Sequence, residues 1–119
     1  MKRLMLVIML LASAIAQAQE PRTWHFTGAE LATALAGRMP SEVRDASLGR
    51  QFSASYAQAY ILGVADQTQG TLWCTRSGVL PHELKDRVYT YLSELPASRL
   101  DGNAAPLVSE ALRRSFACR

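Results

Sequence analysis

The residues best suited to chemistry are two cysteines, Cys74 and Cys118, and two histidines, His25 and His82. Cys74 precedes His82 closely enough to suggest a thiol–imidazole pair, but no third group is placed to orient the histidine. The four side chains together offer zinc ligands, yet they lack the short C-x-x-C and H-x-x-x-H spacings of zinc sites. The spacing therefore favours neither arrangement.

Other catalytic patterns are missing from the sequence. It contains no G-x-S-x-G nucleophile turn and no glycine-rich phosphate loop. Asp66 lies in an apolar segment, and we interpret it as the solvent edge of a helix rather than a buried functional acid. Trp24 and Trp73 are interpreted as packing residues. We predict a binding or structural protein rather than an enzyme, with no cofactor and no metal site.

The first 18 residues have the form of an export signal. A short basic start precedes an apolar run over residues 4–14, and Ala16-Gln17-Ala18 fits the small-x-small cleavage pattern. The apolar run is shorter than the roughly 20 residues of a membrane-spanning helix. We predict cleavage after Ala18 and a single domain over residues 19–119. No long apolar stretch follows, so we expect no stable membrane insertion.

Removal of the signal changes the charge of the protein. The whole chain carries 13 basic and 10 acidic residues, a net charge of +3. Loss of Lys2 and Arg3 leaves 11 basic residues against 10 acidic ones, a net charge of +1. The sequence also has no basic cluster with interleaved aromatic residues, so nothing in it indicates nucleic-acid binding.

Export makes a disulfide the default use of Cys74 and Cys118. The bond would close a loop of about 45 residues, for which chain entropy gives about 4 kcal/mol of stabilisation. A domain of this size buries a modest core, so such a staple matters. The residues by themselves leave open two free thiols or an intermolecular bond.

Apolar periodicity predicts an all-α, four-helix domain stapled by one disulfide, because no segment alternates with period two. The first helix begins with a capping box, Thr27 with Glu30, and ends at Gly37. The four helices are expected over about 28–37, over about 47–69, from Pro81 to a stop at Pro96, and from near Ala104 onward.

The long helix carries apolar and small residues at spacings of three and four. This spacing predicts a core-facing stripe of Phe52, Tyr56, Ala59, Tyr60, Gly63, Val64 and Gln67. Gly63 costs a helix about 1 kcal/mol relative to alanine, so we expect close packing or a local kink there. The small residues fit tight packing inside the domain and fit the seam of a homodimer equally well.

Short motifs follow one another in a defined order along the chain. They are Thr27-Gly28-Ala29-Glu30-Leu31, Tyr60-Ile61-Leu62-Gly63-Val64-Ala65-Asp66, Trp73-Cys74, Gly78-Val79-Leu80-Pro81, Tyr91-Leu92, Leu107-Val108, Ala111-Leu112 and Phe116-Ala117-Cys118. In order and spacing this set resembles the Rap/Tai family of type VI secretion immunity proteins. The resemblance covers nearly all of residues 19–119. Many members carry a further cysteine where this chain has Ala57, so any second disulfide is absent.

The resemblance implies a periplasmic, helical protein, often a homodimer, that binds a peptidoglycan-cleaving amidase effector. Such an inhibitor plugs the substrate cleft of the amidase and needs no catalytic group of its own. The resemblance also carries over the pairing of Cys74 with Cys118. Two other classes stay open at this point: a periplasmic acid-stress chaperone and a generic envelope accessory protein.

The partner-binding surface is predicted in the turn-rich segment between the third and fourth helices, residues 96–103. Its candidate contact residues are Arg99, Leu100, Asp101 and Asn103. Arg99 is the first candidate for a partner contact, because arginine is enriched at binding hot spots. The alternative interpretation is a solvated connector. The second candidate surface is the segment over residues 71–80.

Overall fold

Helices make up the fold of residues 21–119, which are the residues that the computed structural model describes. The predicted export signal and its cleavage site lie outside the described residues. The helices are α2 (Gly28–Leu35), α3 (Ala46–Thr68), α4 (Pro81–Glu94), α5 (Ala97–Leu100) and α6 (Ala104–Ser115). Within residues 21–119 no strand is formed, so the predicted all-α class is confirmed. The single-turn α5 aside, four helices form the domain, as predicted.

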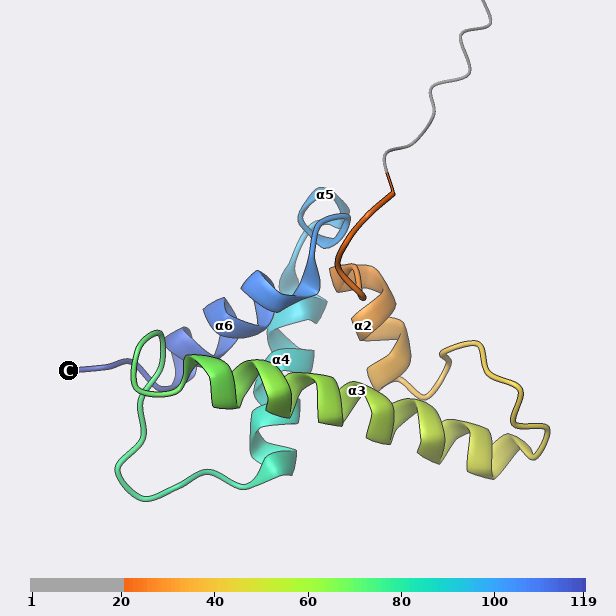
Figure 1. Ribbon diagram of the computed structural model, residues 1–119, viewed down its shortest axis with the longest axis horizontal. Helices are drawn as coiled ribbons and strands as arrows, with labels where there is room; N and C mark the ends of the chain where they lie inside the picture. Colours follow the sequence, from red (N-terminus) through yellow and green to blue (C-terminus); the bar gives the residue numbers. More distant parts are fainter. Residues whose placement is uncertain (1–20) are drawn as a thin grey trace, which may run out of the picture.

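The long α3 is the element that the other long helices share. It contacts α2, α4 and α6, and α4 also packs against α6. Figure 1 shows α3 running along one side of the domain, with α4 crossing behind it. The N-terminal half of α3 and the loop that precedes it extend beyond the other helices (Figure 1).

Local sequence signals set the helix ends. The hydroxyl of Thr27 accepts a hydrogen bond from the amide of Glu30, and the Glu30 carboxylate accepts one from the amide of Thr27, both at 2.9 Å. The predicted capping box is therefore confirmed. Asp45 caps α3 by accepting from the amide of Leu48 at 2.8 Å. Gly37 ends α2 with a φ of 78°, which glycine adopts without steric cost.

The core lies where α2, α3, α4 and α6 meet. Its largest fully buried apolar side chains are Leu31, Ile61, Val88, Leu92, Val108 and Leu112. Gly28 allows α2 to approach α6 closely, because an added Cβ there would lie 2.7 Å from the Leu107 side chain. A side chain at position 28 would require the buried Leu107 side chain to shift.

The predicted core stripe on α3 is wrong for most of its members. Phe52 is 44% exposed and Tyr56 is 41% exposed, and Gly63 also faces solvent. Only Tyr60 and Val64, at the edge of the stripe, are half-buried. The buried stripe is instead Ser53, Ala57, Ile61 and Ala65. Both stripes have helical spacing, and the one with smaller side chains faces the bundle because it lets three helices approach α3.

Gly63 has no packing role inside the domain. A Cβ added at this position would meet no atom within 4 Å, and the residue lies inside the uninterrupted helix Ala46–Thr68. The expected close internal approach at Gly63 is therefore wrong for the described part of the chain.

The segment over residues 96–103 contains the one-turn helix α5, where the sequence indicated only turns. Pro96 precedes α5 in extended backbone, and its carbonyl accepts from the amide of Arg99 at 2.9 Å. Residues 101–103 form the turn into α6, as expected.

The first testable prediction concerns Ser53, which is fully buried. Its hydroxyl donates to the carbonyl of Ala34 at 2.8 Å and accepts from the amide of Met39 at 2.9 Å. Ser53→Ala removes the shared partner of both groups, so the free energy of unfolding should fall by about 1–3 kcal/mol in urea denaturation. The control Ser55→Ala, exposed on the same helix, should change it by less than about 0.5 kcal/mol. An equal effect of both variants contradicts this role.

Candidate functional site

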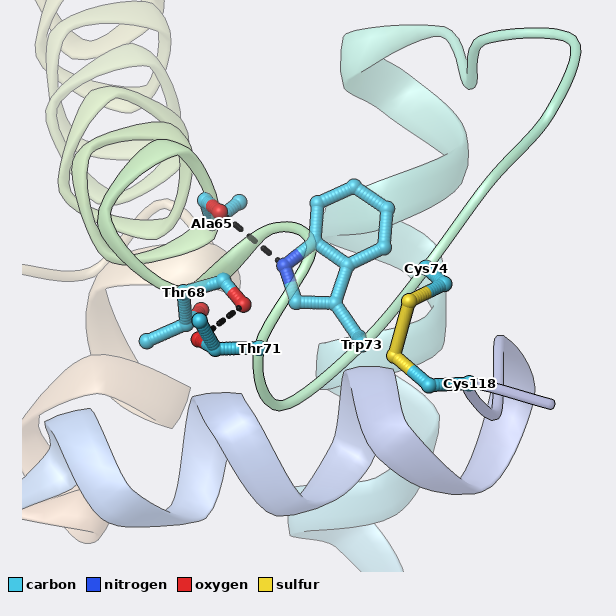
Figure 2. The surroundings of a disulfide bond; sticks show 6 residues. All are labelled: Ala65, Thr68, Thr71, Trp73, Cys74 and Cys118. Atoms are coloured by element: carbon cyan, nitrogen blue, oxygen red, sulfur yellow. Dashed lines mark hydrogen bonds between the residues drawn. A yellow bond between two sulfur atoms is a disulfide. The ribbon is translucent and has the colours of Figure 1, made fainter.

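The predicted disulfide joins the ends of two helices. Cys74 follows α3, Cys118 follows α6, and their sulfur atoms are bonded at 2.05 Å (Figure 2). The amide of Cys74 also donates to the carbonyl of Phe116 at 2.9 Å. The predicted pairing of Cys74 with Cys118 within one chain is confirmed, and among the described residues neither cysteine is a free thiol.

Trp73 strengthens the same junction. Its indole is buried, and Nε1 donates to the carbonyl of Ala65 at 2.9 Å, as Figure 2 shows. The indole ring packs against Phe116 with 5.9 Å between the ring centroids. Trp73 is therefore a packing residue, as predicted. Trp24 is half-buried, and the guanidinium of Arg22 lies over its ring at 4.8 Å.

The disulfide removes the chemistry that the two cysteines suggested. Bonded sulfurs are neither thiolate nucleophiles nor metal ligands. His82 is exposed on the first turn of α4, whereas His25 shares a hydrogen bond of 3.0 Å with the hydroxyl of Tyr56. Among residues 21–119 no three His, Cys, Asp or Glu side chains gather closely enough to hold a metal ion. The Cys74–Cys118 junction therefore has a structural role, because it holds the ends of α3 and α6 together.

Arg99, the leading candidate contact, is tied to α6. Its guanidinium pairs with the carboxylate of Glu110 at 2.9 Å, and both side chains remain partly exposed. A hydrogen bond from Tyr91 lowers the pKa of Glu110, and the charges of Arg99 and Arg113 lower it further. Because this pKa is depressed in the folded state, the stability it contributes is present above the ordinary carboxyl pKa. It is lost as the pH falls through the folded-state value.

The other candidate residues of segment 96–103 divide into two roles. Leu100 is half-buried and lies against Gly28 of α2. Asn103 caps α6 by accepting from the amide of Ala105 at 3.1 Å, and it bridges to Thr27. Asp101 is exposed. Leu100 and Asn103 therefore hold the segment in place, while Asp101 and Arg99 are accessible to a partner.

The second candidate surface, residues 71–80, is a loop held at its Cys74 end by the disulfide. Leu72 is 46% exposed and Leu80 is 58% exposed. Gly78 adopts a φ of 77°, a left-handed conformation that favours glycine. The loop therefore presents apolar side chains from a fixed base.

Two grooves flank the exposed side of α3, and the sequence indicated neither. The α3–α6 groove has a volume of ≈ 890 Å³ and is lined by Tyr60, Gly63, Leu72 and Arg113 among others. The α2–α3 groove has a volume of ≈ 930 Å³, and Glu42, Val43, Phe52 and Tyr56 belong to its lining. The aromatic residues at helical spacing on α3 were the available signal, but we assigned them to the core.

None of the helices within residues 21–119 combines the length and hydrophobicity that crossing a membrane requires.

The second testable prediction concerns the disulfide. Cys74→Ser should lower the free energy of unfolding by about 4 kcal/mol, because the bond closes a chain separation of 44 residues. Thermal unfolding under oxidising conditions measures the loss, and reduction of the native protein should reproduce it. The conservative control is Ser77→Ala in the same loop, which should leave the melting temperature unchanged. An unchanged melting temperature for Cys74→Ser would contradict the stabilising role of the disulfide.

A comparison with known families gives a match to the Rap1a immunity proteins over residues 27–118. The matched range begins at the capping box of α2, ends at the second cysteine, and includes all five helices described above. No curated protein matches the chain. Since the match spans well over half of the sequence, the chain belongs to the Rap1a immunity protein family.

Proposed function

We propose that this chain is a periplasmic immunity protein that binds and blocks a peptidoglycan amidase delivered by a type VI secretion system. The observation that carries the proposal is the family match over residues 27–118. The intramolecular disulfide supports an oxidising compartment, in agreement with the predicted export signal. The Rap/Tai resemblance supplies the amidase as target and a homodimer as the working form.

Inhibition of this kind needs a rigid surface and no catalytic group. The junction of α3 with α6 fixes the helices before a partner arrives, so little conformational freedom is lost on binding. A few well-placed side chains then supply most of the affinity. This mechanism agrees with the bonded state of Cys74 and Cys118.

The direct test is protection of cells against the effector. Cells that direct the amidase to their own periplasm should lyse, and production of the full chain should prevent lysis. A variant without residues 1–18 should give no protection, because it would stay in the cytoplasm, away from the amidase. Lysis despite the exported chain contradicts the function. Equal protection by the variant contradicts the compartment.

Within the proposed function, Arg99 and Asp101 are the contact residues, and Leu100 and Asn103 position them. The support is structural: the first two side chains are exposed, whereas the second two contact α2 or cap α6. The ion pair of Arg99 with Glu110 also holds the guanidinium in one place. A side chain fixed before binding loses less entropy at an interface.

The third testable prediction follows from this assignment. The double variant Arg99→Ala/Asp101→Ala should weaken amidase binding by about tenfold or more, as expected for hot-spot truncation. Its melting temperature should hold, since an exposed ion pair contributes little stability. The matched control is Asp86→Ala/Arg87→Ala, which removes an exposed acid and base from α4. Titration calorimetry measures the affinity of each double variant for the amidase. An unchanged affinity of Arg99→Ala/Asp101→Ala would show that segment 96–103 is only a connector.

A further inference from the structure

The disulfide brings together two segments that are both basic. Residues 67–82 and 111–119 contain four arginines, one histidine and no acidic residue. The Cα atoms of Cys74 and Cys118 lie 4.8 Å apart, so the two segments meet at the bond. Figure 1 shows the α3–α4 loop and the C-terminal segment at the same end of the molecule. The basic end, as we call it, consists of Arg76, Arg113, Arg114 and Arg119.

The side chains of the basic end are open to solvent. All four arginines are exposed, and within residues 21–119 none of them forms an ion pair. Glu110, the acid one turn before Arg114 on α6, is already paired with Arg99. Outside the basic end, residues 19–119 carry seven basic and ten acidic side chains, a net charge of −3. The positive charge is therefore concentrated at one end of the molecule.

The fold accounts for only two of these four arginines. Arg113 and Arg114 lie in the last turn of α6, where the helix dipole favours cations, and Arg114 lies over the ring of Tyr91 at 5.2 Å. Arg76 and Arg119 lie outside the helices, one in each of the joined segments. Among the described residues no ion pair holds either guanidinium. Their charges are therefore available to a partner.

Exposed leucines accompany the charges. Leu72 and Leu80 precede and follow Arg76 in the α3–α4 loop, and they are 46% and 58% exposed. Leu72 also shares the lining of the α3–α6 groove with Arg113. The large aromatic residues of the two segments are less accessible, because Trp73 is buried and Phe116 is half-buried. This end of the molecule therefore presents cations together with aliphatic side chains.

We infer that the basic end docks on the surface of an anionic phospholipid membrane. Arginine binds phosphate through paired N–H donors, and an anionic lipid surface attracts each basic side chain that comes near it. Leucine side chains enter the boundary between headgroups and acyl chains, where they leave water. Protein hot spots are instead enriched in tryptophan and tyrosine and poor in leucine. The composition of the basic end therefore fits a lipid surface better than an acidic protein.

This inference goes beyond the immunity function and does not depend on it. It gives the second candidate surface, residues 71–80, a lipid partner in place of the effector. The proposed effector contacts, Arg99 and Asp101, belong to the separate segment 96–103. Figure 1 shows α5 of that segment well apart from the C-terminal segment. The lipid and the effector therefore use different surfaces.

The fourth testable prediction is measured by flotation of vesicles with the oxidised protein purified after export. Vesicles of equal parts phosphatidylglycerol and phosphatidylcholine should bind it, and binding should fall as salt is added. Phosphatidylcholine vesicles should bind it far more weakly. Arg76→Glu/Arg119→Glu should weaken binding by at least roughly thirtyfold, because each basic residue contributes about fivefold. The matched control Arg38→Glu/Arg44→Glu reverses two exposed arginines outside the basic end and should bind nearly as the wild type does.

A leucine variant tests the apolar part of the surface. Leu80 is the N-cap residue of α4, and serine is favoured at such positions, so Leu80→Ser should keep the start of the helix. Loss of the inserted side chain should weaken vesicle binding by about fivefold. The matched control Leu48→Ser removes a leucine that is 57% exposed on α3 and should leave binding unchanged.

Three results would overturn the inference. The first is absent binding, or equal binding to the two kinds of vesicle. The second is wild-type vesicle binding by Arg76→Glu/Arg119→Glu; if that variant loses amidase binding instead, the basic end is an effector surface. The third is unchanged vesicle binding by Leu80→Ser, which would reduce the interaction to electrostatic adsorption. The vesicle measurements require no amidase, so this inference and the immunity function can fail separately.

Discussion

The junction between the end of α3 and the end of α6 is the interaction on which the rest of the structure depends. Three contacts act there together: the Cys74–Cys118 bond, the hydrogen bond from Cys74 to Phe116, and the indole of Trp73 on Ala65. A domain of this size has a total stability of about 5–15 kcal/mol, and the bond alone accounts for about 4 kcal/mol of it. Without this junction, only the small hydrophobic core would hold α3 against α2, α4 and α6.

The two faces of α3 explain how a small helical domain serves as a binding protein. The inner face uses Ser53, Ala57, Ile61 and Ala65 to bring α2, α4 and α6 close. The opposite face carries larger side chains, of which Leu48, Phe52 and Tyr56 are exposed. A fold that places its small residues inside and leaves aromatic residues outside retains apolar surface for partners. An immunity protein, which works only by forming an interface, requires such surface.

The sequence predicted the helices because their signals are local, and it predicted the disulfide because the chain has only two cysteines behind an export signal. The capping box at Thr27, Pro81 at the first turn of α4 and Gly37 after α2 act within a few residues of themselves. It did not predict which stripe of α3 is buried. Phe52 and Ile61 both belong to stripes with helical spacing, and only the approach of three other helices selects between them. The Arg99–Glu110 pair was missed for the same reason, since it joins residues on two elements whose relative placement local patterns do not define.

We propose that this disulfide-linked helical domain acts as an amidase inhibitor. Titration of the purified, oxidised protein into the amidase, followed by release of peptidoglycan peptides, tests it most directly. We predict that amidase activity falls in proportion to added protein and is abolished once the two are present in stoichiometric amounts. Full amidase activity in the presence of excess oxidised protein would contradict the account.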